Sequence, residues 1–165
     1  MGKRAALIAA AALALVSIAA AADGGSSLTA NGVAVDAPDG WSRVVAAPSA
    51  RVGDPRTMLV AGTRGVAPRA SECQVAAYRI PADGAAVVIL GWRGPAPDGV
   101  PRDRSELAAM RLKRPTFECW DGRGAVARIV LRGRAYQVNV MVGDRASRDT
   151  VADALAVARS VGTDN

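Results

Sequence analysis

The chain has 165 residues, no histidine, two cysteines and a formal net charge of +6. Without histidine, the usual base of a serine or cysteine nucleophile and the commonest nitrogen ligand of zinc are both missing. Aromatic residues make up only 4 % of the chain, which leaves little stacking surface for bases, so we expect no cofactor and no nucleic-acid partner.

Residues 1–22 have the pattern of a secretory signal peptide. A basic start, Met1-Gly2-Lys3-Arg4, precedes an apolar run that ends in three small residues, Ala20-Ala21-Ala22. We therefore expect a secreted or extracytoplasmic protein. The alternative is a retained N-terminal membrane anchor, because the apolar run approaches the ~20 residues that span a bilayer.

Cleavage after about Ala22 defines the expected domain organisation. It leaves 143 of the 165 residues and lowers the net charge from +6 to about +4, because Lys3 and Arg4 are removed. This length suits one domain with one core. We expect a flexible mature N-terminus at 23–30 and a single domain at 31–162.

Export also determines how the two cysteines are interpreted. In an oxidising compartment two cysteines usually pair, so we expect a Cys73–Cys119 disulfide. The bond would close a loop of about 46 residues, worth at most roughly 4 kcal/mol on the chain-entropy model. A nucleophilic Cys119 would need an activating base, for which the sequence offers no histidine.

The first half of the domain consists of apolar runs separated by turns. Strands are predicted at 33–37 and 41–45, around the turn residues Pro38-Asp39-Gly40. Further strands are predicted at 57–63 and 85–92, and the second of these is the most apolar run of the domain.

Two segments remain open between helix and strand. Ser71 and Gln74 fit a capping box, so a short helix is predicted at 72–79, with a strand as the alternative. Residues 106–114 suit either a helix capped by Ser105 or a strand. Between these segments, the loop 93–104 holds three prolines and two glycines and is the first place to look for a functional surface.

The last third of the chain predicts a meander followed by a helix. Strands are expected at 116–120, 125–132 and 135–142, with turns at 121–124 and 132–134. A helix at 148–161 follows, capped by Ser147 and apolar at helical spacing. The prediction is therefore an α+β domain: an antiparallel sheet of about six or seven strands, covered on one face by this helix, with a short middle helix.

The order of these parts resembles the PsbP-like fold group. The resemblance rests on the turn Pro38-Asp39-Gly40-Trp41, on the antiparallel strands, and on a last helix that ends in "ARSVG". The segments "FEC", "GRAYQV" and "GDRAS" are also similar to uncharacterised actinobacterial secreted proteins. Members of the PsbP-like group act as accessory, assembly or lipid-handling factors, so the resemblance implies a non-catalytic role.

The sequence offers residues for three kinds of site. A carboxylate-dependent hydrolase would need paired acids, but the only glutamates are Glu72, Glu106 and Glu118, and most aspartates lie beside glycine in turns. A basic cluster that contacts an anionic surface is formed by Arg102, Arg104, Arg111, Lys113 and Arg114. An apolar pocket between the sheet and the helix at 148–161 would be lined by Trp41, Trp92 and Trp120.

The leading hypothesis is an exported, non-catalytic accessory or binding domain of the cell envelope. Its partner would be an envelope protein, a lipid or a wall component. The alternatives are a basic protein that binds envelope polymers or lipid headgroups through the cluster at 102–114, and a carboxylate-dependent hydrolase.

Overall fold

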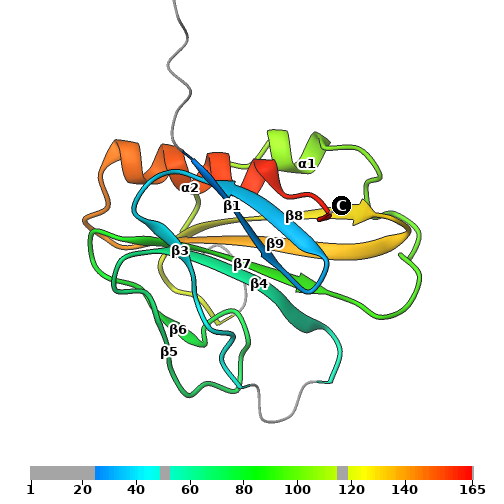
Figure 1. Cartoon of the computed structure of the whole chain (residues 1–165), viewed down its shortest axis with the longest axis horizontal. Coiled ribbons are helices and arrows are strands. Elements are labelled where there is room, and N and C mark those ends of the chain that lie inside the picture. Colours follow the sequence, from blue (N-terminus) through cyan, green and yellow to red (C-terminus); the bar gives the residue numbers. More distant parts are fainter. Residues whose placement is uncertain (1–24, 49–52, 115–118, 165) are drawn as a thin grey trace, which may run out of the picture.

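A five-stranded antiparallel sheet forms the centre of the computed structural model, which describes residues 25–48, 53–114 and 119–164 (Figure 1). Its strands, in spatial order, are β3 (Trp41–Arg43), β4 (Arg56–Thr63), β7 (Ala85–Gly91), β9 (Arg134–Val142) and β8 (Arg123–Leu131). Two pairs lie outside it: β1 (Ser26–Ala30) with β2 (Val33–Ala37), and β5 (Ala67–Pro68) with β6 (Tyr78–Arg79). The helices are α1 (Ser105–Ala108) and α2 (Arg148–Ser160).

The α+β class is confirmed, and the strands are divided differently from the prediction. The expected sheet of about six or seven strands is one sheet of five strands with two separate pairs.

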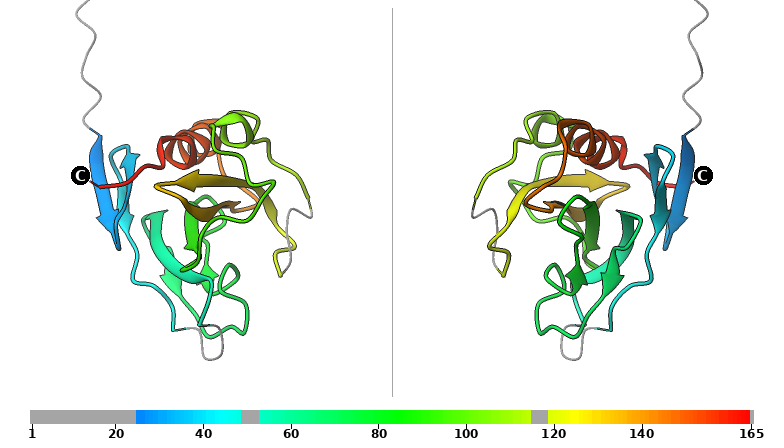
Figure 2. Two further views of the ribbon diagram at one scale, coloured as in Figure 1. Left: turned by 90° about the vertical axis from the view of Figure 1, so that its right-hand side faces the viewer. Right: turned by 90° about the vertical axis from the view of Figure 1, so that its left-hand side faces the viewer.

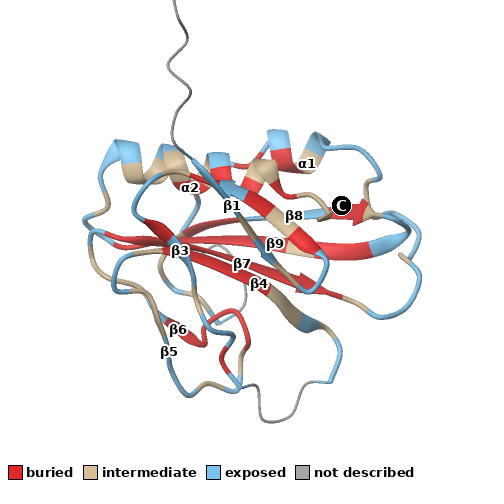
Figure 3. Ribbon diagram, in the orientation of Figure 1, coloured by how far each residue is buried: buried red, intermediate tan, exposed pale blue. Residues whose placement is uncertain are grey.

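Strand β7 is the centre of the sheet. It pairs with β4 on one side and with β9 on the other, and all seven of its residues are buried (Figure 3). Its side chains alternate between two cores: Ala85, Val87 and Ile89 face one, and Ala86, Val88 and Leu90 face the other. Both faces of the sheet must therefore be covered where β7 runs.

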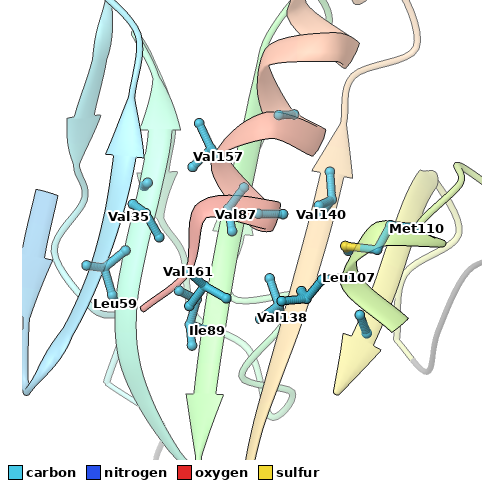
Figure 4. Close-up of a cluster of buried hydrophobic side chains, with 14 of the residues drawn as sticks. Val35, Leu59, Val87, Ile89, Leu107, Met110, Val138, Val140, Val157 and Val161 are labelled. Atoms are coloured by element: carbon cyan, nitrogen blue, oxygen red, sulfur yellow. The ribbon is translucent and has the colours of Figure 1, made fainter. Parts of the chain in front are cut away.

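The helices and the β1–β2 hairpin cover the first face. Val157 of α2 and Val161, the residue that follows α2, pack over Val87 and Ile89, beside Leu107 of the α1 turn (Figure 4). The hairpin stands at the side of the sheet (Figure 2), where Ala34 forms a β-bridge with Gly162 just after α2. Helix α2 thus lies roughly where the sequence predicts it, and it shares this face with α1 and the hairpin.

Irregular chain covers part of the second face. Val75, Ala77 and Tyr78 pack there with Ala47 against Val88 and its neighbours. The Tyr78 hydroxyl accepts a hydrogen bond from the backbone N–H of Ala47 at 3.1 Å. Burial raises the pKa of Tyr78 above its ordinary value of 10.0, against the effect of this hydrogen bond.

The outer edge of β8 is occupied by the segment 101–113. The backbone groups of Lys113 and Gly124 bond to each other in both directions, at 2.8 and 3.1 Å. The N–H of Arg128 donates to the Glu106 carboxylate at 2.7 Å, and the N–H of Val130 donates to the carbonyl of Pro101 at 2.9 Å.

Most predicted elements are confirmed within two residues. They are the strands at 33–37, 57–63, 85–92, 125–132 and 135–142, the turn at 38–40, and the helix at 148–161 with its Ser147 cap. The strand predicted at 41–45 ends at Arg43. The turn between β8 and β9 is tight because Arg132 and Gly133 both have positive φ, the conformation of a type I′ hairpin.

The helix predicted at 72–79 is wrong. Residues 74–78 are all buried in succession, which a one-turn helix on a sheet surface does not allow. The Ser71 hydroxyl accepts from the N–H of Cys73 at 3.1 Å, so it closes a local turn instead of capping a helix. Tyr78–Arg79 then pairs with Ala67–Pro68, which makes the strand alternative correct at the end of this segment.

Three other segments differ from the prediction in whole or in part. Residues 26–30, expected within the flexible N-terminus, form β1 and pair with β2. At 106–114 both alternatives hold in part: a single helical turn, Ser105–Ala108, precedes a bridge at Lys113. Residues 123 and 124 of the predicted turn belong to β8. The strand predicted at 116–120 lies mostly outside the described residues.

Two arginines, one at the start of α1 and one in the last turn of α2, connect the two helices. The Arg104 guanidinium, which precedes α1, donates to the carbonyl of Val161 at 2.6 and 2.9 Å and to that of Arg159 at 3.1 Å. Arg159 of α2 donates in return to the carbonyls of Leu107 and Met110 at 3.3 and 3.2 Å. Each arginine thus satisfies carbonyls that the end of the other helix leaves without an intrahelical donor.

We expect Arg104→Gln to lower the free energy of unfolding by about 1–2 kcal/mol, because charged hydrogen bonds to the end of α2 are lost. Arg102→Gln is the matched control: it removes an exposed arginine two residues away, and the described residues supply its side chain with no hydrogen bond or ion pair. Urea unfolding of both variants measures the difference. Equal losses would contradict the capping role.

Candidate functional site

A cavity of about 480 Å³ lies beneath the loop 93–104 and is the best candidate for a ligand site. Its volume falls within the ~300–1,000 Å³ of small-molecule pockets. It is lined by Asp54, Trp92, Gly94, Pro95, Pro97, Val100, Arg128, Ala135, Tyr136 and Gln137.

The loop is fixed over the sheet at several points. The N–H of Trp92 donates to the carbonyl of Ala135 at 3.2 Å, and that of Ala96 donates to the carbonyl of Gly133 at 2.9 Å. The bond from Val130 to Pro101 fastens its far end. Between these points the prolines restrict φ and lack the N–H that a further backbone hydrogen bond to the sheet would need. The loop is therefore attached to the sheet at its ends and leaves a hollow beneath its middle.

Of the strand residues that line the cavity, Gln137 and Arg128 belong to the second face of the sheet, and Tyr136 belongs to the first. Tyr136 and Val138 face the first core, so Gln137 points to the opposite side, and its partner Arg128 on β8 does the same. The expected pocket between the sheet and α2 is not where the cavity lies. Ala154, Val157 and Ala158 of α2 are fully buried against the sheet, so close-packed side chains fill that interface.

A chain of side-chain amides forms the floor beside the cavity. Gln137 Nε2 donates to Asn139 Oδ1 at 2.8 Å, and Asn139 Nδ2 donates to the carbonyl of Val88 at 3.2 Å. Asn139 is fully buried, and these bonds meet its need for partners. The hydrogen bond to Asn139 engages the Gln137 amide nitrogen and so orients this side chain.

Two charged groups border the cavity, each with a structural partner. Asp54 Oδ1 accepts the N–H of Arg93 at 3.1 Å. Arg128 Nη2 donates to Glu106 Oε1 at 2.9 Å, and the two side chains are 52 % and 32 % exposed. Burial of Glu106 would raise its pKa, but the hydrogen bonds from the side chain and N–H of Arg128 outweigh this and hold the pKa below its ordinary value.

The three tryptophans do not form one pocket. Trp92 lines the cavity, whereas Trp41 is 8 % exposed in the first core and borders a separate hollow near Asp39. Trp120 packs on the second core, and its indole N–H donates to the carbonyl of Arg123 at 3.2 Å.

Most of the basic cluster has intramolecular partners. Arg104 caps α2, Arg111 donates to the carbonyls of Ala108 and Met110 at the end of α1, and Arg114 forms an ion pair with Asp144. All five side chains are exposed, and the backbone of Lys113 bonds to that of Gly124 at the edge of β8. The five residues therefore contribute mainly to the ends of the helices and to the edge of the sheet.

The cysteines lie near each other, on the second face. Cys73 is partly buried against the second core and Cys119 is exposed. The Cys73–Cys119 disulfide stays a prediction.

The two glutamates among the described residues lie in different surroundings. Glu106 is engaged by Arg128, Glu72 is exposed on the irregular segment, and Glu118 lies outside the described residues. In residues 25–48, 53–114 and 119–164, no three Cys, Asp or Glu side chains are arranged to hold a metal ion.

Most residues that line the cavity were missed in the sequence, although a signal for some of them is present. Gln137 and Asn139 interrupt an apolar strand on alternate positions, and Arg128 does the same on β8. Polar residues on one face of a central strand indicate a face that is not fully covered. Asp54 gives no such signal, since only the fold brings it to the loop.

The sequence matches no protein-family model and no curated protein. Within the part of the chain that the structure describes, the helices are all too short or too polar to cross a membrane.

The Glu106–Arg128 pair predicts a specific pH dependence. Because the pKa of Glu106 is lower in the folded protein, its contribution to stability is fully present above the ordinary value of 4.5 and is lost as the pH falls through the folded value. Wild type should therefore have a higher Tm than Glu106→Gln at pH 7, and the difference should shrink and then close as the pH falls below the ordinary value of 4.5. Asp98→Asn, which removes an exposed loop carboxylate, is the control. A difference that does not change with pH would contradict the pairing.

The cysteines predict a thiol count. Protein exported by a bacterial host with its own leader should contain no titratable thiol when denatured without reductant, and two after reduction. Its mass should lack residues 1–22. Two thiols before reduction would rule out the Cys73–Cys119 bond.

Proposed function

We propose that the protein is an exported, non-catalytic binding domain of the cell envelope, and that the cavity beneath the loop 93–104 is its ligand site. The observation that supports this most directly is the cavity itself, because it combines a fixed loop, an apolar lining and a few oriented polar groups. The apolar leader supports export, and the resemblance to the PsbP-like group supports an accessory role.

The chemistry around the cavity favours binding over catalysis. Arg128 is held by Glu106, and Gln137 is held by the amide chain, so the polar groups are placed as fixed contacts. A hydrolase would need a second carboxylate close to an acid or base in the cavity. Asp54 in the lining accepts a hydrogen bond from Arg93, and Glu106 accepts hydrogen bonds from the lining residue Arg128.

The neutral probe N-phenyl-1-naphthylamine tests whether the cavity binds an apolar ligand. The wild type should bind it saturably, with a rise in probe fluorescence, and Trp92→Ala should weaken binding at least tenfold, because Trp92 supplies the largest apolar surface of the lining.

Trp120→Ala is the matched control, since Trp120 lies outside the cavity. It should keep the wild-type affinity. Equal affinity of wild type and Trp92→Ala, or no saturable binding at all, would refute the proposed site.

A further inference from the structure

We infer that the ligand of this cavity is a small amphiphile with a single anionic group, bound with that group against Arg128 and with its apolar body over Trp92 and the prolines of the loop. This inference rests on the proposed function and adds the chemical class and the orientation of the ligand. Carboxylate, sulfonate and phosphate groups share the recognition chemistry involved.

The apolar part of the lining is rigid. Trp92 and Ala135 are fixed by their mutual backbone bond, and Pro95 and Pro97 have restricted φ. Val100 completes this wall near the end of the loop that Pro101 fastens to β8. Such a surface suits a ring system or a short chain, since little conformational entropy is lost when it is covered.

The charges lie at opposite sides of the cavity. Arg128 pairs in register with Gln137, Gln137 with Leu90, and Leu90 with Thr57, so one row crosses the sheet from β8 to β4. Three strand spacings separate the ends of this row, about 14 Å. Asp54 lies just before β4, and therefore on the side opposite Arg128. An anionic group is attracted to the β8 side and repelled from the β4 side, which sets the orientation.

Arg128 has donors left for a ligand. Glu106 occupies one Nη, and the described residues supply no acceptor to the remaining guanidinium N–H groups. A guanidinium presents five donors in a planar fork, so it can hold Glu106 on one side and a ligand oxygen on another. Glu106 also accepts the backbone N–H of Arg128, which fixes the carboxylate in place and steadies the guanidinium.

A pair of matched probes tests the ligand class. They are the neutral N-phenyl-1-naphthylamine and its 8-sulfonate, which share the ring system and differ in one anionic group. At low ionic strength the wild type should bind the sulfonate about fivefold more tightly than the neutral probe, the scale of a half-exposed ion pair.

Variants locate the preference within the cavity. Arg128→Gln should reduce the ratio of the two affinities to about one, and Arg128→Lys should keep part of the preference. Asp54→Asn and Glu106→Gln should keep or increase it, because each removes a competing negative charge. Arg132→Gln, at the exposed turn of the same hairpin, is the control and should bind as the wild type does.

The outcomes separate the inference from the proposed function. If the wild type binds both probes equally, or if Arg128→Gln and Arg128→Lys both keep the full preference, the anionic class is wrong and the cavity remains a binding site. If neither probe binds saturably, the proposed function fails, and the inference fails with it. A circular-dichroism melt of each variant checks that it is folded before the ratios are compared.

Discussion

The complete burial of β7 is the constraint on which the rest of the structure depends. A strand with apolar side chains on both faces is stable only when both faces are covered. The two helices and the β1–β2 hairpin cover one face, and the irregular segment around Tyr78 covers much of the other. Because both faces must be covered and the domain has only one long helix, irregular segments of the chain complete the cover.

The second face is covered unevenly, and the cavity is the result. The segment around Tyr78 packs over β4 and β7, while on β8 Val126 remains 40 % exposed and Arg128 is also exposed. The loop 93–104 arches over the end of this less covered half. Of the polar residues on this half of the sheet, Asn139 is the buried one, and its hydrogen bonds to Gln137 and to the carbonyl of Val88 make its burial possible. Core packing and the site are thus two consequences of the same uneven cover.

The sequence predicted the regular parts of the fold well because local patterns determine them. The apolar run of β7, the turn at Arg132-Gly133 and the Ser147 cap each act over a few residues. The segment 72–79 was mispredicted because its capping pattern is overridden by burial against a distant sheet. The cavity was missed for a related reason: Asp54, Trp92 and Arg128 are brought together only by strand order, which a single sequence does not encode locally.

The segment 101–113 also affects solubility, because it covers the outer edge of β8. An edge strand with unpaired backbone groups is a template for strand addition and aggregation. On β8, the bonds to Pro101, Glu106 and Lys113 occupy this edge at three positions. A neighbouring chain therefore finds no continuous row of donors and acceptors there. The same segment continues directly from the loop that covers the cavity. A substitution that detached this segment from β8 would therefore open the cavity and also expose an edge strand that can pair with another chain.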